Sequence, residues 1–429
     1  MEGITVIKPE TPPREEDIEK LREGVAQILK GIKERGDKAL REFSKRFDNY
    51  DPPSFRVSEE EMDEAERSLD PEVKRGLDYG IERVRAFAQA QRARLQEFEE
   101  EMAPGIFMGH RVVPVDSCAC YVPAGRYPCL TSAVMSIVPA KVAGVRRLVT
   151  CSPPGRDGHI NWPILYTMRA SGADEVYCMG GAHAIGAVAY GTETIPRVDL
   201  VAGPGNRWVT EAKRQVYGEV GIDFLAGPSE VLVIADSTGR PDWIAADLLA
   251  QLEHDPNARG CLVTTSEELA RATIKEVERQ LERLSTGDVA GVSWKNNGLV
   301  AVARDLDAAC AFTNDYAPEH LEVHTENPKA LLPKLTSYGS LFLGEMAAEV
   351  FADKVAGTNH ILPTLRAARY TGGVWVGTFL KVITHQWVSP EGMKVLAPIS
   401  ARQALEEGMA AHRAAALIRI EGAASKSQK

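Results

Sequence analysis

Apolar residues recur at every third or fourth position in two long segments near the beginning of the chain. The first is residues 18–47, IEKLREGVAQILKGIKERGDKALREFSKRF, and the second is residues 73–98, VKRGLDYGIERVRAFAQAQRARLQEF. Because an α-helix has 3.6 residues per turn, this spacing places the apolar side chains on one face and the charged side chains on the other. The pattern predicts a charged helical leader over residues 15–101.

The pattern changes after Pro104 to short β-branched runs that end in glycine or proline turns. Strands are expected within residues 146–155, 174–181, 198–206, 229–236 and 260–266. Helical segments such as SAVMSIVPAKVAGV and WIAADLLAQLEH lie between these runs, and such an alternation builds parallel sheets with helices on both faces. The expected fold class is α/β, with two Rossmann-like parallel-sheet domains. The order of elements predicts a helical leader over residues 1–114 that contributes to the second α/β domain, a first α/β domain over 115–236, a second over 237–372, and a helical C-terminal tail over 373–429.

Composition and charge exclude several kinds of partner. Of the 429 residues, 44% are hydrophobic and 26% charged, as in ordinary folded globular proteins. The 60 acidic and 50 basic side chains give a net charge of -10, which argues against binding to nucleic acid. The longest uncharged run, residues 176–192, is shorter than the roughly 20 residues that span a bilayer, and the N-terminus lacks the features of a signal peptide. The chain is therefore expected in the cytoplasm, without a membrane or nucleic-acid partner.

Glycine-rich turns are predicted after several of the strands, at residues 121–125 (YVPAG), 180–181 (GG), 203–206 (GPGN) and 227–229 (GPS). Glycine lets backbone N–H groups approach a phosphate or carboxylate, and open α/β sheets bind ligands at the carboxyl ends of their strands. Purely structural turns would have the same residues, and the dinucleotide fingerprint G-x-G-x-x-G is absent. The turns favour a ligand site at the carboxyl edge of a sheet.

Two pairs of polar residues could carry chemistry. Gln251 and His254 are three apart in a segment of helical periodicity, AADLLAQLEHD, so they could share one helix face and bind one metal ion. A structural pair in the core or at the surface would have the same spacing. Glu319 and His320 follow Pro318 in a turn-like stretch, where a carboxylate and an imidazole could share proton transfers. An isolated Glu-His dipeptide is also common without any such role.

More oxygen and imidazole ligands follow along the chain. Asp353 and His360 flank a glycine-bearing segment that is predicted to be a loop. His412 lies on the last predicted helix, and Glu407 precedes it by about one and a half turns. A catalytic zinc ion with an open coordination position uses ligands of these types. Each residue alone indicates little, but together they suggest a site.

Five sequence blocks resemble those of histidinol dehydrogenases and occur in this order: GPGN, EVGIDFLAGPSEVLVIAD, DLLAQLEHDP, APEHLEV and AGTNHILPT. The resemblance covers nearly the whole chain. It implies a zinc-dependent, NAD-linked enzyme of histidine biosynthesis, which oxidises L-histidinol to the aldehyde and then to L-histidine while two NAD are reduced. It also implies a homodimer, in which the tail of the partner chain completes each active site.

The resemblance also implies roles for single residues. The catalytic pair would be Glu319, which activates water, and His320, which acts as the base. The zinc ligands would be Gln251, His254, Asp353 and His412. The substrate contacts would be Ser229, Gln251, His254, His320, Asp353, His360, Glu407 and His412. The NAD contacts would be Tyr121, Asn206 and His183, the last at a position where the family usually has glutamine.

Two departures from the family pattern concern the substrate. The chain has YVPAGRYPCLTS where the family commonly has YVPGG and small residues, which puts Arg126 at the mouth of a candidate ligand turn. The stretch ARYTGGVWVGTFLKVITHQW resembles the paralogous sulfopropanediol dehydrogenases, which oxidise dihydroxypropanesulfonate, a small anionic diol. Another amino alcohol or an anionic diol is therefore an alternative substrate. A non-catalytic descendant of the fold is a further alternative, against which the retention of Glu319 and His320 argues.

Overall fold

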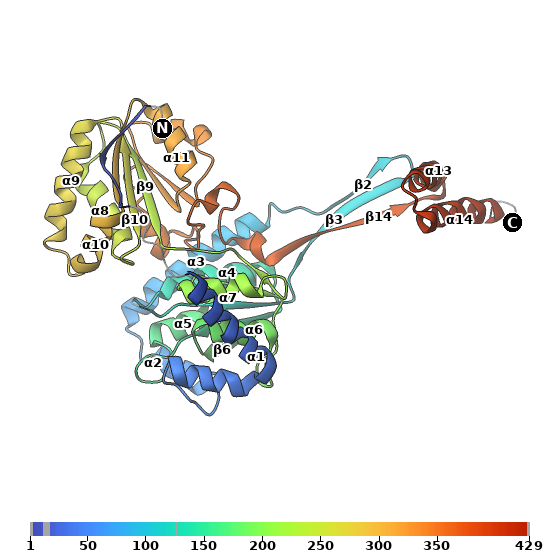
Figure 1. Cartoon of the computed structure of the whole chain (residues 1–429), viewed down its shortest axis with the longest axis horizontal. Coiled ribbons are helices and arrows are strands. Elements are labelled where there is room, and N and C mark those ends of the chain that lie inside the picture. Colours follow the sequence, from blue (N-terminus) through green and yellow to red (C-terminus); the bar gives the residue numbers. More distant parts are fainter. Residues whose placement is uncertain (1–2, 12–17, 126, 427–429) are drawn as a thin grey trace. The chain divides into compact units, whose positions relative to one another are not determined.

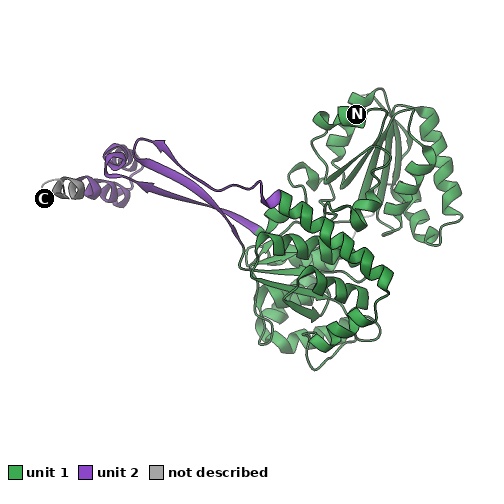
Figure 2. Cartoon of the chain, turned by 180° about the vertical axis from the view of Figure 1, so that it is seen from behind, with its two compact units in different colours: residues 1–90, 115–379 green, residues 91–114, 380–429 purple. Residues whose placement is uncertain are grey.

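The computed structural model describes residues 3–11, 18–125 and 127–426, with side chains described as far as residue 420. The chain forms two compact units, which Figure 2 colours separately. Residues 1–90 and 115–379 belong to the first unit, and residues 91–114 and 380–429 belong to the second. None of the described helices is both long and apolar enough to cross a membrane. The α/β class is confirmed, because helices alternate with strands and the two larger sheets are parallel apart from one edge strand.

The first sheet of the first unit has five parallel strands (Figure 1). In spatial order they are β6 (Glu175–Cys178), β5 (Arg147–Ser152), β4 (Ser117–Tyr121), β7 (Leu200–Ala202) and β8 (Gly221–Ile222). Helices α6 (Gly181–Tyr190) and α7 (Arg207–Val216) pack on one face, and α4 (Leu130–Ala143) packs on β4 and β5 with α5 (Trp162–Ser171) beside it. The central strands are buried on both faces, so apolar residues predominate in them.

The helical leader packs against this first sheet. It comprises α1 (Ile18–Phe47), α2 (Glu59–Arg67) and α3 (Pro71–Arg92). The apolar face of α1 is buried in the core shared with α6 and α7. The helices predicted over residues 18–47 and 73–92 are confirmed, whereas residues 98–101, also predicted to be helical, lie in a strand.

The second sheet of the first unit has six strands. In spatial order they are β1 (Ile4–Lys8), β11 (Gly298–Ala303), β10 (Arg259–Thr264), β9 (Glu230–Ala235), β12 (His320–His324) and β13 (Ser340–Leu343), and only β1 is antiparallel. Helices α8 (Pro241–Leu252), α9 (Glu267–Leu281) and α10 (Gly287–Asn297) cover one face, and α11 (Leu306–Tyr316) covers the other. Short helical segments complete the unit: η1 (Pro328–Lys334), α12 (Glu349–Phe351), η2 (Ala352–Ala356), η3 (Ala367–Arg369) and η4 (Val376–Phe379).

Both parallel sheets reverse their strand order once, between β4 and β7 in the first and between β9 and β12 in the second. Ligands of open α/β sheets bind outside the carboxyl ends of the strands at such a reversal. In the first sheet Tyr121 and Gly203 lie at this point. A Cβ atom on Gly203 would be 2.2 Å from the carbonyl oxygen of Tyr121, and the φ angle of Gly203 is +110°, so only glycine fits there.

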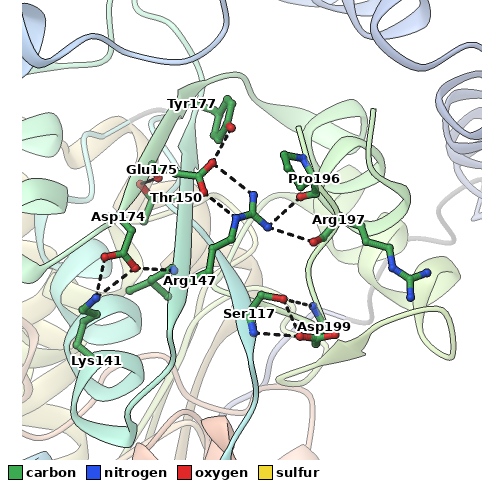
Figure 3. A network of polar contacts seen from close by, with 11 residues as sticks. Ser117, Lys141, Arg147, Thr150, Asp174, Glu175, Tyr177, Pro196, Arg197 and Asp199 are labelled. Carbon is green, nitrogen blue, oxygen red and sulfur yellow. Dashed lines mark hydrogen bonds and ion pairs between the residues drawn. The ribbon is translucent and has the colours of Figure 1, made fainter. Parts of the chain in front are cut away.

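Polar contacts tie together the opposite, amino-terminal edge of the first sheet (Figure 3). Arg147 at the start of β5 donates to the carboxylate of Glu175 at 2.7 and 3.3 Å and to the carbonyl oxygens of Pro196 and Arg197 at 3.1 Å each. Asp199 accepts from the hydroxyl of Ser117 at 2.6 Å. These contacts occupy the amino-terminal edge, so the carboxyl edge is the one available to a ligand.

The second unit is an antiparallel sheet followed by two helices. Its strands are β14 (Leu380–Val388), β3 (Ile106–Pro114) and β2 (Phe98–Ala103), and Phe107 stacks on Trp387 at a ring distance of 3.8 Å. Helices α13 (Pro390–Glu406) and α14 (Ala410–Lys426) follow β14. The expectation of an entirely helical tail is therefore wrong for residues 380–388. The partner of β14 lies some 270 positions earlier in the sequence, and no local pattern reveals that pairing.

Candidate active site

A cavity of about 700 Å³ opens in the first unit and collects most of the candidate residues. Its lining comes from the segment after β4, the start of α4, the loop before β9, the end of α8, the start of β12 and the η2 region. Seven of the residues predicted from the sequence line it: Ser229, Gln251, His254, Glu319, His320, Asp353 and His360. Residues separated by more than 130 positions in the sequence therefore share one cavity.

The cavity lies at the amino ends of β9 and β12, which are neighbours in the second sheet. Ser229 directly precedes β9, and His320 is the first residue of β12, in register with Val231. The 227–229 turn follows β8 of the first sheet, as expected, but it also leads directly into β9, so in the second sheet it lies at the amino edge rather than the carboxyl edge. A parallel sheet presents different residues at its two edges, and the sequence does not show which edge closes against the rest of the unit.

Three of the four residues expected to bind zinc lie in this cavity. Gln251 is buried in the last turn of α8, and the N–H of His254 lies 3.3 Å from its carbonyl oxygen, just beyond the end of the helix at Leu252. Asp353 lies in η2 with its side chain 14% exposed. An amide oxygen, an imidazole and a carboxylate are suitable donors for a zinc ion with an open position, so these residues fit the metal.

A buried carboxylate that the sequence reasoning missed orients Gln251. With its nitrogen as the donor, the amide of Gln251 lies 2.8 and 3.2 Å from the two carboxylate oxygens of Glu349. This orientation leaves the amide oxygen as the free donor atom. Glu349 precedes Asp353 by four residues, a spacing that could have indicated it, and these two with His320 form a buried group able to hold a metal ion.

The environment of His320 suits a base. Its Nδ1 lies 3.1 Å from the carbonyl oxygen of Glu230 and 3.0 Å from the amide of Gln251. When Nδ1 is protonated, its N–H donates to the Glu230 carbonyl; when it is not, it can accept from the Gln251 amide. Nε2 is buried and has no hydrogen-bond partner among the described residues. Burial lowers the pKa of His320 to about 4, although the charge of Asp353 acts in the opposite direction. The imidazole is therefore neutral near pH 7, and in the tautomer with Nδ1 protonated its Nε2 can accept a proton.

The two carboxyl groups of the cavity differ in electrostatics. Burial raises the pKa of Glu319 well above its usual range, although its Oε2 accepts the N–H of Glu230 at 2.8 Å. Burial also opposes ionisation of Asp353, but the imidazoles of His360 and His320 outweigh it and lower the pKa of that carboxyl. The raised pKa makes ionised Glu319 a stronger proton acceptor than an exposed glutamate, whereas Asp353 is the anionic candidate ligand.

His360 is held between two elements of the cavity wall. Its Nδ1 lies 3.1 Å from the carbonyl oxygen and 3.5 Å from the carboxylate of Asp353, and its Nε2 lies 3.4 Å from the hydroxyl of Ser132 in α4. Ser132 was also missed from the sequence, because nothing in its local pattern distinguishes it from an ordinary helix residue.

The three expected NAD contacts lie at the carboxyl edge of the first sheet, outside the cavity lining. The hydroxyl of Tyr121 accepts the N–H of Gly181 at 3.2 Å. Asn206 caps α7 by accepting the N–H groups of Trp208 and Val209. The ring of His183 is buried, with Nε2 3.0 Å from the carboxylate of Asp48. A role for His183 toward NAD stays a prediction.

The remaining candidates lie elsewhere. Glu407 caps α13, and His412 lies in α14 beyond a break at Gly408. One helix was expected over this stretch, and the structure corrects it to two. Both side chains are exposed on the second unit. Arg126 lies outside the described residues.

Residues 12–420 match the histidinol dehydrogenase family. The chain belongs to that family. A histidinol dehydrogenase homolog of Shouchella clausii is 47% identical over 402 residues, which cover 94% of this chain and 95% of that protein. A histidinol dehydrogenase of Methanothermobacter thermautotrophicus is 41% identical over 396 residues, 92% of each. The crystal structure of histidinol dehydrogenase from Elizabethkingia anophelis superposes with a TM-score of 0.91 at 35% identity, over 96% of this chain and 94% of that one.

Membership of the histidinol dehydrogenase family confirms the resemblance seen in the sequence. The chain is therefore an oxidoreductase that acts on a small molecule. Two of the similar proteins are named homologs of histidinol dehydrogenase, so the family name alone leaves the substrate open.

Proposed function

We propose that the chain oxidises L-histidinol to L-histidine through the aldehyde, with zinc and two molecules of NAD. The charge of the cavity carries this choice of substrate. Its described lining includes four carboxyl groups but a single ammonium group, that of Lys354. Burial raises the pKa of Glu319 and Glu349. The negative charge of the lining therefore rests on the carboxylates of Glu253 and Asp353, which still exceed that one positive charge. Such a lining attracts the cationic amine of an amino alcohol and disfavours a sulfonate.

In this proposal the protein's own groups move the protons of both steps. Nε2 of His320 takes the hydroxyl proton of the alcohol while the carbon-bound hydrogen leaves as hydride to NAD. Glu319 then takes a proton from water as that water adds to the aldehyde. As the water adds, protonated His320 gives its proton to the aldehyde oxygen and becomes a base again. His320 then takes one hydroxyl proton of the hydrate when the second hydride leaves to NAD, which gives the carboxylic acid, and the acid loses its remaining proton to form the carboxylate.

The cofactor positions are part of the same proposal. Gln251, His254 and Asp353 would hold zinc, which when bound acts as a Lewis acid and positions the substrate. The turn at Gly203 and the residues Tyr121, His183 and Asn206 would contact NAD at the strand reversal of the first sheet. Glu407 and His412 would come from the second unit of a partner chain in a homodimer.

A second candidate substrate is a small anionic diol such as dihydroxypropanesulfonate. The stretch 368–387 favours it, because it resembles the sulfopropanediol dehydrogenases. An anion would need a cationic partner, for which Arg126 is the candidate.

Comparing NAD reduction with L-histidinol and with dihydroxypropanesulfonate separates the two candidates. We expect turnover of L-histidinol with two NAD reduced per molecule. Glu407→Gln should raise KM for L-histidinol without loss of zinc, because it removes a carboxylate that attracts the amine. Arg126→Ala serves as the control and should leave that KM unchanged. Turnover of the anionic diol alone, abolished in Arg126→Ala, would reverse the assignment.

A further inference from the structure

A second group of buried polar residues lies on the face of β12 that α8 covers. Alternate residues of a strand point to the same face, and His320, Glu322 and His324 are paired in register with Val231, Val233 and Ala235 of β9. These β9 residues belong to the core beneath α8. His320 is in the active-site cavity, but neither Glu322 nor His324 lines it.

Helix α8 supplies the third member of the group. Asp247 precedes Gln251 by four residues and so lies on the same helix face, one turn farther from the cavity. Nε2 of His324 is 3.2 Å from Oε2 of Glu322 and 3.9 Å from Oδ2 of Asp247. The three ligand atoms all lie within 4.8 Å of one another, and Asp247 does not line the cavity either.

One oxygen of this group lacks a hydrogen bond. The Glu322 side chain is fully buried, and its Oε1 accepts the N–H of Glu349 at 2.8 Å. Its Oε2 faces the imidazole of His324, but makes no hydrogen bond with any described residue. A buried carboxylate oxygen without a partner is costly, so the arrangement calls for a positively charged or donating ligand.

The charges of the group also favour a positively charged ligand. The carboxyl group of Asp247 lies within 4.8 Å of that of Glu322, and both lie beside the imidazole of His324. Two carboxyl groups are thus crowded together beside one imidazole. A cation between them would neutralise both carboxylates, and the side chain of Asp247, 15% exposed, offers a route from solvent.

We propose that Asp247, Glu322 and His324 bind a divalent cation of the zinc class, in a site separate from the active-site cavity. Two carboxylates and one imidazole are suitable ligands for such an ion, and a water molecule at Asp247 would complete four-coordination. In a tetrahedral zinc site the ligand atoms are about 3.4 Å apart, close to the observed separations. The ion joins α8 to β12 one turn from Gln251, so it also fixes the end of the helix that enters the cavity.

Metal analysis of the full-length protein, loaded with zinc and then desalted, tests the site. Asp247→Asn and His324→Gln should each bind one equivalent of zinc fewer than the wild type. Asp242→Asn, which changes an exposed acid of the same helix, is the matched control and should keep the wild-type content. His254→Ala should remove the zinc of the proposed catalytic site. The double variant His254→Ala/Asp247→Asn should then bind one equivalent of zinc fewer than His254→Ala alone.

Crystals of the wild-type protein give a test that needs no variant to fold. Anomalous scattering at the zinc edge should show a peak among the three side chains, distinct from any peak at His254. The absence of such a peak, or wild-type zinc content in folded Asp247→Asn and His324→Gln, would overturn the proposal. An infrared band of a protonated carboxyl that disappears in Asp247→Asn, with zinc content unchanged, would show that a proton occupies the site instead.

Discussion

Replacing Lys213 by methionine should strongly destabilise the first sheet and its glycine turn. Lys213 in α7 and Asp223 after β8 form an ion pair whose side chains are 4% and 1% exposed. The ammonium also donates to the carbonyl oxygen of Gly203 at 2.9 Å, and Asp223 accepts the N–H of Gly203 at 2.8 Å. The pair therefore holds both backbone groups of the glycine at the strand reversal.

The size of the effect follows from burial. Methionine retains most of the apolar stem of Lys213 but leaves the carboxylate of Asp223 buried without its partner, which costs about 3–5 kcal/mol. For a folded domain of about 150–250 residues, each kcal/mol of lost stability lowers the melting temperature by roughly 2–4 °C, so we expect the melting temperature to fall by about 6–20 °C. Adding Asp223→Asn removes the unpaired charge and should restore part of that loss.

Thermal unfolding followed by circular dichroism, together with NAD titration, measures these effects. Lys33→Met is the matched control, because Lys33 also forms an ion pair, with Glu219, but both side chains are about half exposed. That pair is screened by solvent, and its loss should hardly change the melting temperature. NAD binding should weaken only in Lys213→Met. The reasoning is refuted if both lysine variants melt alike, or if the added Asp223→Asn gives no recovery.

Three further predictions concern the cavity. His254→Ala and His412→Ala should each lose zinc and activity together. Mixed dimers of the two variants should regain zinc and activity. Full zinc content in either single variant would refute the ligand assignment. Glu349→Gln should weaken zinc binding by about 10- to 100-fold in a chelator competition, because one of the two oxygens that accept from the amide of Gln251 becomes an NH2 donor. Glu345→Gln, outside the cavity, should not weaken it. Glu319→Gln should slow oxidation of the aldehyde more than that of the alcohol in single-turnover assays; equal slowing would contradict the division of labour with His320.

Local sequence patterns determined the elements and the candidate chemistry. The helices over residues 18–47 and 241–252, and the strands over residues 147–152 and 230–235, follow from periodicity and from the turns that bound them. Short motifs also placed Gln251 beside His254, and Glu319 beside His320. Such signals are readable because the spacing of side chains along a helix or strand depends only on nearby residues.

Only the tertiary structure decided which sheet edges and which faces of helices and strands pack together. It placed Ser229 and His320 at the amino ends of their strands, paired β14 with β3, and positioned Glu349 behind Gln251. It also buried Glu322 and His324 against Asp247, where a sequence reader sees only an ordinary strand and helix. Burial, pKa and metal-ligand geometry depend on neighbours far away in the chain, and those neighbours are set by packing rather than by local pattern.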